Sequence, residues 1–109
     1  MLTRISIILT LLPMFLAANP LHVSAKGELT VMLDWFVNPD HGPLIIAHEK
    51  GFFSQMGLDV NIVAPANPND PPKLVAAGKV ELAISYQPQL HVQVSEGLPL
   101  IRIGTLIAT

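Results

Sequence analysis

Apolar and polar positions alternate in short segments along residues 26–109, and turn-forming residues separate these segments. Near-alternating, β-branched segments are typical of strands, whereas apolar residues three or four positions apart are typical of helices. We therefore expect strands at residues 28–33, 58–64, 81–85 and 100–107. We expect helices at residues 44–54, 71–77 and 88–95, which end at Gly57, Gly78 and Gly97.

The connections between these segments predict an α/β fold. Residues 38–43 and 65–72 are rich in proline and asparagine and are expected to be loops. Asp70 is expected to cap the second helix, because prolines follow it where a backbone N–H would be unpaired anyway. Strands that alternate with helices predict βαβ units and a parallel sheet. The last predicted strand has no stop signal, which predicts the front part of a larger domain; the alternative is a complete small α/β protein.

The first 25 residues have the pattern of an export signal. A basic start at residues 1–4 precedes a fourteen-residue apolar run at residues 5–18. This length suits a signal-peptide core and is short for a spanning helix of about 20 residues. Small residues at Val23–Ala25 predict cleavage after Ala25, although an uncleaved anchor or a buried helix is the alternative. Export without a cysteine for lipid attachment predicts a periplasmic protein.

Composition excludes several classes of function. The chain has 109 residues and no cysteine, which excludes disulfides, thiolate metal sites and a cysteine nucleophile. A net charge of −2 without a basic run gives no sign of a nucleic-acid partner. Glycine-rich nucleotide loops and a serine nucleophile elbow are absent. His48 and Glu49 begin like a zinc-protease helix, but Phe52 stands where the second histidine would be. We therefore expect no cofactor, no metal and no catalytic residue.

Aromatic and polar side chains cluster where two predicted strands end. Asp34 and Trp35 follow the first strand, with Asn38 and His41 in the next loop, and Tyr86 follows the third strand. Parallel sheets bind ligands beyond the carboxyl ends of their strands. A tryptophan face beside amide and carboxylate groups suits a flat, polar heterocycle. The alternative is that Trp35 and Tyr86 are core aromatics at the rim of the sheet.

Two stretches of the sequence resemble one family of proteins. Residues 33–43 read L-D-W-F-V-N-P-D-H-G-P, and residues 65–70 read P-A-N-P-N-D, followed by K-L-V-A-A-G-K-V-E-L-A at 73–83. Their order and spacing resemble the solute-binding proteins of ABC transporters for thiamine precursors. They also resemble the yeast-type hydroxymethylpyrimidine phosphate synthases that share this fold. The D-W…N…H-x-P segment is specific to this pyrimidine branch. The segments K-G-F-F at 50–53, G-L-D-V at 57–60 and the one at 73–83 also occur in sulfonate, taurine and nitrate relatives.

The resemblance implies a type II periplasmic-binding-protein fold, in which two α/β lobes close on a ligand. Residues 26–109 would be the front part of the first lobe, without the second. The resemblance implies that Trp35 stacks on a pyrimidine ring while Asp34 and Asn38 pair with ring nitrogens or the exocyclic amine. His41 would contact the ligand or cap the turn, and Tyr86 would lie near the ligand. The implied ligand is a hydroxymethyl- or formylamino-type thiamine pyrimidine, and the implied partner is an ABC permease.

The same resemblance distinguishes a binding protein from an enzyme. The synthases carry a lysine that holds pyridoxal phosphate and, four residues later, a histidine that is consumed as substrate. The matching positions here are Ser85 and Gln89. Serine cannot form a Schiff base, and glutamine cannot supply an imidazole. We therefore expect a binding protein; a synthase that depends on pyridoxal phosphate and iron, a sulfonate-type binding protein and a non-functional truncated product are the alternatives.

Overall fold

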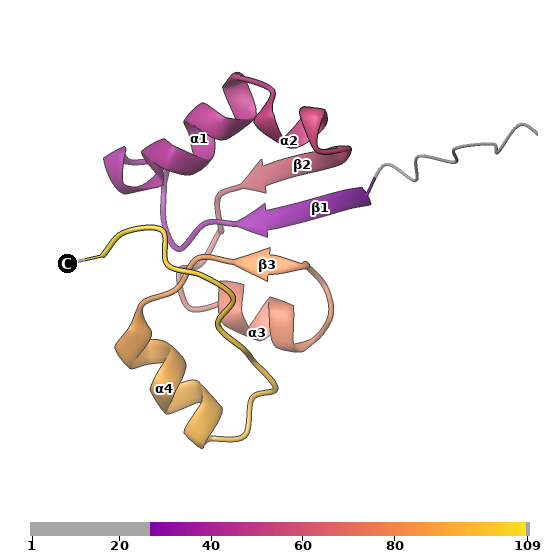
Figure 1. The fold of residues 1–109 in the computed structure, drawn as a ribbon. Coiled ribbons are helices and arrows are strands. Elements are labelled where there is room, and N and C mark those ends of the chain that lie inside the picture. Colours follow the sequence, from indigo (N-terminus) through magenta and orange to yellow (C-terminus); the bar gives the residue numbers. More distant parts are fainter. Residues whose placement is uncertain (1–26, 109) are drawn as a thin grey trace, which may run out of the picture.

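Three parallel strands form the centre of the fold in the computed structural model, which describes residues 27–108 (Figure 1). β1 (Gly27–Met32) lies between β2 (Leu58–Val63) and β3 (Leu82–Ala83). β1 pairs with β2 along its whole length but with β3 only at its last two residues. The predicted α/β fold with a parallel sheet is confirmed. The predicted export signal, residues 1–25, lies outside the described residues.

Helices lie on both sides of these strands. η1 (Pro39–His41), α1 (Gly42–Glu49) and α2 (Phe52–Gln55) connect β1 to β2, and α3 (Pro71–Ala76) connects β2 to β3. α4 (Gln87–Ser95) follows β3. Figure 1 shows α1 and α2 beside β2, and α3 and α4 beside β3. Within residues 27–108, no helix has the length and apolar character needed to cross a membrane.

The first crossover differs from its prediction in two places. The single helix expected at residues 44–54 is divided, because Gly51 adopts a left-handed conformation with φ of 71° that a continuous α-helix does not contain. The loop expected at residues 38–43 instead contains the short helix η1. Asn38 caps this helix. Pro39 fits its first turn because proline has no backbone N–H that would need a hydrogen-bond partner there.

The ends of the predicted helices are confirmed at three glycines. The φ angles of Gly57, Gly78 and Gly97 are 76°, 68° and 94°, in the left-handed region that favours glycine after a helix. The prediction that Asp70 caps the second helix is wrong as regards its side chain. Asp70 does precede α3, but its side chain makes no capping hydrogen bond. Two prolines in the first turn of α3 remove N–H groups that a cap would otherwise satisfy.

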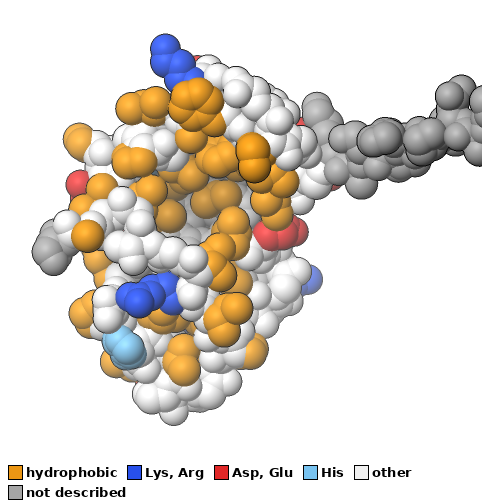
Figure 2. Space-filling view, viewed as in Figure 1, with side chains coloured by type: hydrophobic (Ala, Val, Ile, Leu, Met, Phe, Trp, Pro, Cys, Tyr) orange, Lys and Arg blue, Asp and Glu red, His pale blue; other side chains and the backbone are white. Residues whose placement is uncertain are grey.

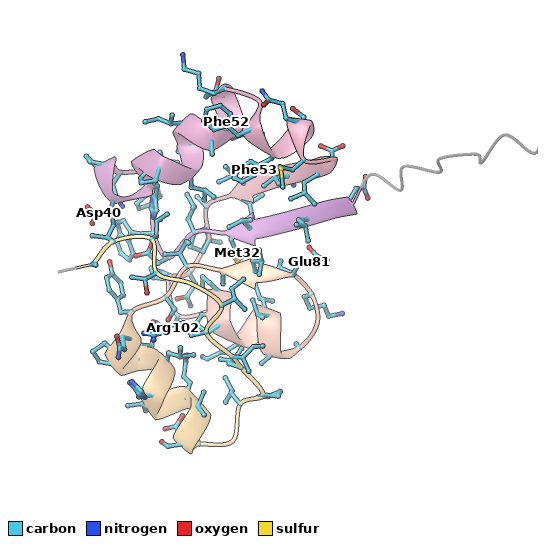
Figure 3. The ribbon with its side chains drawn as sticks, in the orientation of Figure 1. Met32, Asp40, Phe52, Phe53, Glu81 and Arg102 are labelled. Atoms are coloured by element: carbon cyan, nitrogen blue, oxygen red, sulfur yellow. The ribbon has the colours of Figure 1, made fainter. Side chains whose placement is uncertain are left out.

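The strand predicted at residues 100–107 does not form. Ile101 and Ile103 of this segment are 86% and 72% exposed. Arg102 anchors the segment to the start of α4, where its Nη1 donates to Oε1 of Gln87 (3.2 Å; Figure 3). A strand needs a neighbouring strand for its backbone hydrogen bonds, and the two-residue β3 offers too short an edge. The alternating pattern of residues 100–107 therefore suits a strand, but none of the described strands pairs with it.

The buried core of the described residues is small. Its hydrophobic members are Val31, Leu33 and Val60, on β1, its continuation and β2. Figure 2 shows hydrophobic side chains gathered over the centre of the viewed face. Within residues 27–108, twelve large hydrophobic side chains are exposed, which include those of Ile46 and Met56. The sheet therefore depends on few buried side chains.

Candidate functional site

The carboxyl ends of β1 and β3 bring the predicted site residues to one edge of the sheet. The backbone N–H of Leu33 donates to the carbonyl of Val63 (2.8 Å) and extends the β1–β2 pairing up to Asp34. The backbone N–H of Ile84 donates to the carbonyl of Met32 (2.8 Å) and leads the chain towards Tyr86. Because β1 and β3 are neighbours, the residues that follow them lie at the same edge.

His41 is the buried member of this group, with only 1% of its surface exposed. Its Nε2 lies 2.7 Å from Oδ1 of Asp34, and the backbone N–H of Asn38 donates to its Nδ1 (3.2 Å). Since Nδ1 accepts a hydrogen bond, it carries no proton, and the proton of the neutral ring is on Nε2. The imidazole of His41 therefore donates to the carboxylate of Asp34.

Asn38 holds the turn that brings His41 back to Asp34. Its Oδ1 accepts the backbone N–H of Asp40 (2.9 Å), and its Nδ2 donates to the carbonyl of Phe36 (3.0 Å). With His41, it completes a capping box around η1. The structure shows the capping role predicted for His41, and a contact of His41 with a ligand stays a prediction. A contact of Asn38 with a ligand stays a prediction.

The neighbours of Asp34 change the pKa of its carboxyl group. Burial raises the pKa of Asp34, but hydrogen bonds from His41 and Tyr86 lower it by more, so the pKa lies below its ordinary value of 3.8. The hydrogen bond to the same carboxylate raises the pKa of the Tyr86 hydroxyl. At neutral pH, the site thus combines an ionised acceptor with a protonated phenol.

Acidification is expected to remove a stabilising contribution of Asp34. The pKa of Asp34 is lower in the folded chain than in the unfolded one, so the contribution is complete above the ordinary value of about 4 and is lost as the pH falls through the lowered pKa. Urea unfolding of the wild type and Asp34→Asn should therefore give free energies that converge below about pH 4. The control Asp40→Asn, at an exposed carboxylate of the same turn, should keep the wild-type profile. A difference between wild type and Asp34→Asn that does not change with pH would contradict this expectation.

The aromatic residues at this edge of the sheet are exposed. Trp35 is 49% exposed and Tyr86 63% exposed, so the alternative that they are core aromatics is wrong. The rings of Trp35 and Phe36 meet edge to face, with centroids 5.5 Å apart. Phe36 was not among the predicted site residues, although its position directly after Trp35 was a signal. Exposed rings beside an ionised carboxylate can stack on a flat ligand and accept hydrogen bonds from it.

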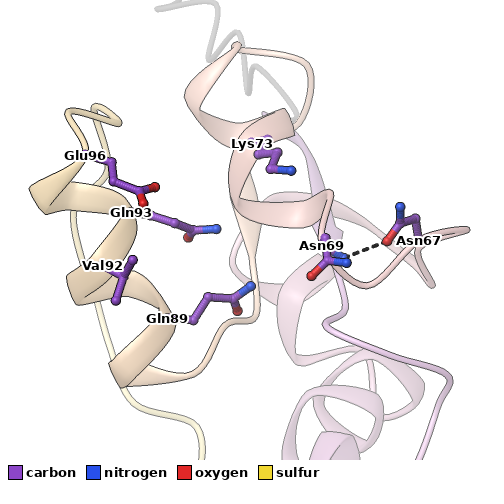
Figure 4. Close-up of a pocket in the computed structure, with 7 residues that line it drawn as sticks. All are labelled: Asn67, Asn69, Lys73, Gln89, Val92, Gln93 and Glu96. Atoms are coloured by element: carbon purple, nitrogen blue, oxygen red, sulfur yellow. Dashed lines mark hydrogen bonds between the residues drawn. The ribbon is translucent and has the colours of Figure 1, made fainter.

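A shallow groove of about 480 Å³ lies between α3 and α4 (Figure 4). Its lining is polar apart from one valine and consists of Asn67, Asn69, Lys73, Gln89, Val92, Gln93 and Glu96. Oε1 of Gln93 is buried there without a hydrogen-bond partner among the described residues. The groove contains no aromatic ring and none of the predicted site residues, so it offers a flat ring no stacking surface. Within residues 27–108, no three histidine, aspartate or glutamate side chains gather to hold a metal ion.

Comparison with known families matches residues 38–109 to the family described as NMT1/THI5 like. A putative thiamine biosynthesis protein of Haemophilus influenzae is 60% identical over 84 residues, which cover 77% of this chain and 27% of the relative. A formylaminopyrimidine-binding protein of Halalkalibacterium halodurans is 40% identical over 107 residues, which cover 94% of this chain and 32% of the relative. A 4-amino-5-hydroxymethyl-2-methylpyrimidine phosphate synthase of Legionella pneumophila is 32% identical over 84 residues, which cover 77% of this chain and 27% of the relative. The chain spans about a quarter to a third of the length of these relatives.

Proposed function

This chain belongs to the NMT1/THI5-like family, and on that basis we propose that it is part of a periplasmic solute-binding protein that captures a thiamine pyrimidine for an ABC importer. The observation that carries the proposal is the exposed ring of Trp35, which follows Asp34 in the chain, at the edge where His41 and Tyr86 hold the Asp34 carboxylate. A flat ring with an exocyclic amine fits both, since one supplies a stacking face and the other an acceptor. The relative named as a formylaminopyrimidine-binding protein supports this class of ligand.

The proposed protein has two lobes and an export signal. Residues 26–109 would supply the front part of the first lobe of a type II periplasmic-binding-protein fold, with which the three-stranded parallel sheet is consistent. The share of the relatives that this chain covers supports a second lobe in the complete protein. Residues 1–25 would be the signal peptide that directs export to the periplasm, cleaved after Ala25. The permease would be the partner of the complete protein in the inner membrane.

The test is ligand-dependent stabilisation of the complete exported protein, whose intact mass also gives its length and its cleavage site. Thermal unfolding is measured with 4-amino-5-hydroxymethyl-2-methylpyrimidine, with its formylamino counterpart, and with taurine and nitrate as controls. A ligand at about 100 times its Kd stabilises the folded state by about 2.7 kcal/mol, which raises the Tm. A rise with either pyrimidine supports the proposal. A rise with taurine or nitrate alone, or with no compound, rejects it.

A pyrimidine synthase is the second candidate, because several relatives carry that name. The family resemblance places the lysine and histidine of such an enzyme at Ser85 and Gln89. In the structure, Oγ of Ser85 donates to Oε1 of Gln89 (3.1 Å), which makes a hydroxyl–amide pair at the start of α4. Neither side chain can form a Schiff base with pyridoxal phosphate, so these residues do not fit that cofactor. The binding function is therefore the better supported of the two.

A further inference from the structure

The backbone of the turn decides which way His41 directs its hydrogen bonds. A backbone N–H can only donate, so the N–H of Asn38 requires Nδ1 of His41 to accept. The other ring nitrogen then carries the proton and must donate to Oδ1 of Asp34, 2.7 Å away. Since His41 is almost fully buried, water does not compete for either bond. The direction of the His41–Asp34 hydrogen bond is thus fixed by the fold.

The same arrangement leaves one kind of group for a ligand. Oδ1 of Asp34 is taken by His41, and the Tyr86 hydroxyl also donates to this carboxylate, whose side chain retains 11% of its surface exposed. An ionised carboxylate has only acceptors to offer. We propose that His41 is a positioning residue that holds the Asp34 carboxylate in the orientation in which its remaining acceptor sites face the ligand, so that the site selects a 4-amino pyrimidine over its 4-oxo analogue.

The selection follows from the groups at the exocyclic position of the ring. An amine offers N–H donors to the carboxylate, whereas a carbonyl would put one acceptor against another. A site built to pair with a substituent rejects an analogue that cannot, because its own polar group is then left unpaired. This inference rests on the proposed function, since it assumes that the ring stacks on Trp35 and that its substituent reaches Asp34.

Asp34→Asn tests the inference with almost no change of shape. Because Nε2 of His41 can only donate, the amide oxygen of the new side chain must take its place at His41, and the amide NH2 must face the ligand. The Kd values for 4-amino-5-hydroxymethyl-2-methylpyrimidine and its 4-oxo analogue are measured by calorimetry on the complete protein. We expect the preference for the amino ring to fall at least about tenfold. Asp40→Asn makes the same change in the same turn at a side chain that does not hydrogen-bond to His41, and should keep the wild-type preference.

Variants of His41 separate positioning from a general structural role. His41→Leu removes both hydrogen bonds, and the preference for the amino ring should fall. In His41→Gln, Oε1 can accept the N–H of Asn38 and Nε2 can donate to Asp34, so the preference should return while circular dichroism checks the fold. Loss of general stability would weaken binding of both rings, whereas loss of positioning changes their ratio.

The outcomes distinguish this inference from the proposed function. If the wild-type protein binds neither ring, both fail. If it binds the amino ring and Asp34→Asn leaves the ratio of the two Kd values unchanged, the proposed function stands and the inference is overturned. A folded His41→Gln that loses the preference as fully as His41→Leu also overturns it, because the conservative replacement should direct Asp34 in the same way.

Discussion

Replacing Leu33 by alanine is expected to lower the free energy of unfolding by about 2–5 kcal/mol, the range for a truncated, fully buried leucine. Leu33 is 0% exposed, and its backbone N–H donates to Val63 (2.8 Å) at the end of the β1–β2 pairing. Val31 and Val60, on β1 and β2, are the buried hydrophobic residues of the sheet that join it. With so few buried neighbours, the described sheet has little other apolar burial to offset the loss.

Urea denaturation of the complete protein measures this effect. Ile101→Ala is a suitable control, because it truncates an aliphatic side chain that is 86% exposed. Truncation at such a surface position should change the free energy of unfolding by no more than about 0.5 kcal/mol. Equal losses in the two variants would mean that burial at the end of β1 does not dominate the stability of the sheet.

The sequence predicted those parts of the fold that depend on local signals. The first two strands were found within one residue of their ends, because their apolar alternation is uninterrupted. Gly57, Gly78 and Gly97 marked helix ends correctly, because a left-handed residue is a local requirement. The strand at residues 100–107 failed because pairing depends on a partner elsewhere in the chain. Gly51 was overlooked because the apolar spacing of residues 44–54 continues across it.

The candidate site was predictable only in part for a similar reason. Asp34, Trp35 and Tyr86 follow strands, and the edge where parallel strands end is a general place for ligands. The hydrogen bond from His41 to Asp34 spans seven positions and exists only because η1 turns the chain back. No periodicity predicts such a turn. The burial of Gln93 was equally hidden, because it results from the packing of α4 and not from its composition.

Replacing Trp35 by alanine is expected to weaken binding of the pyrimidine at least tenfold, since an aromatic stacking contact contributes about 1–3 kcal/mol. Trp35 is 49% exposed, although its ring also contacts Phe36 in an edge-to-face pair, so about half of its surface is accessible to a ligand. Calorimetric titration of the complete protein with 4-amino-5-hydroxymethyl-2-methylpyrimidine measures the change. Phe52→Ala removes an aromatic ring that is 53% exposed on α2, before β2 begins, and should leave the affinity unchanged.

The 4-oxo analogue makes the Trp35 experiment more informative. Stacking depends on the face of the ring, which the amino and oxo compounds share, so Trp35→Ala should weaken both to the same degree. Asp34→Asn should instead change their ratio, because only the exocyclic group differs. An unchanged affinity in Trp35→Ala would remove this residue from the site. A changed ratio in Trp35→Ala would mean that the indole also orients the ring, and that stacking and polar selection are coupled at this edge of the sheet.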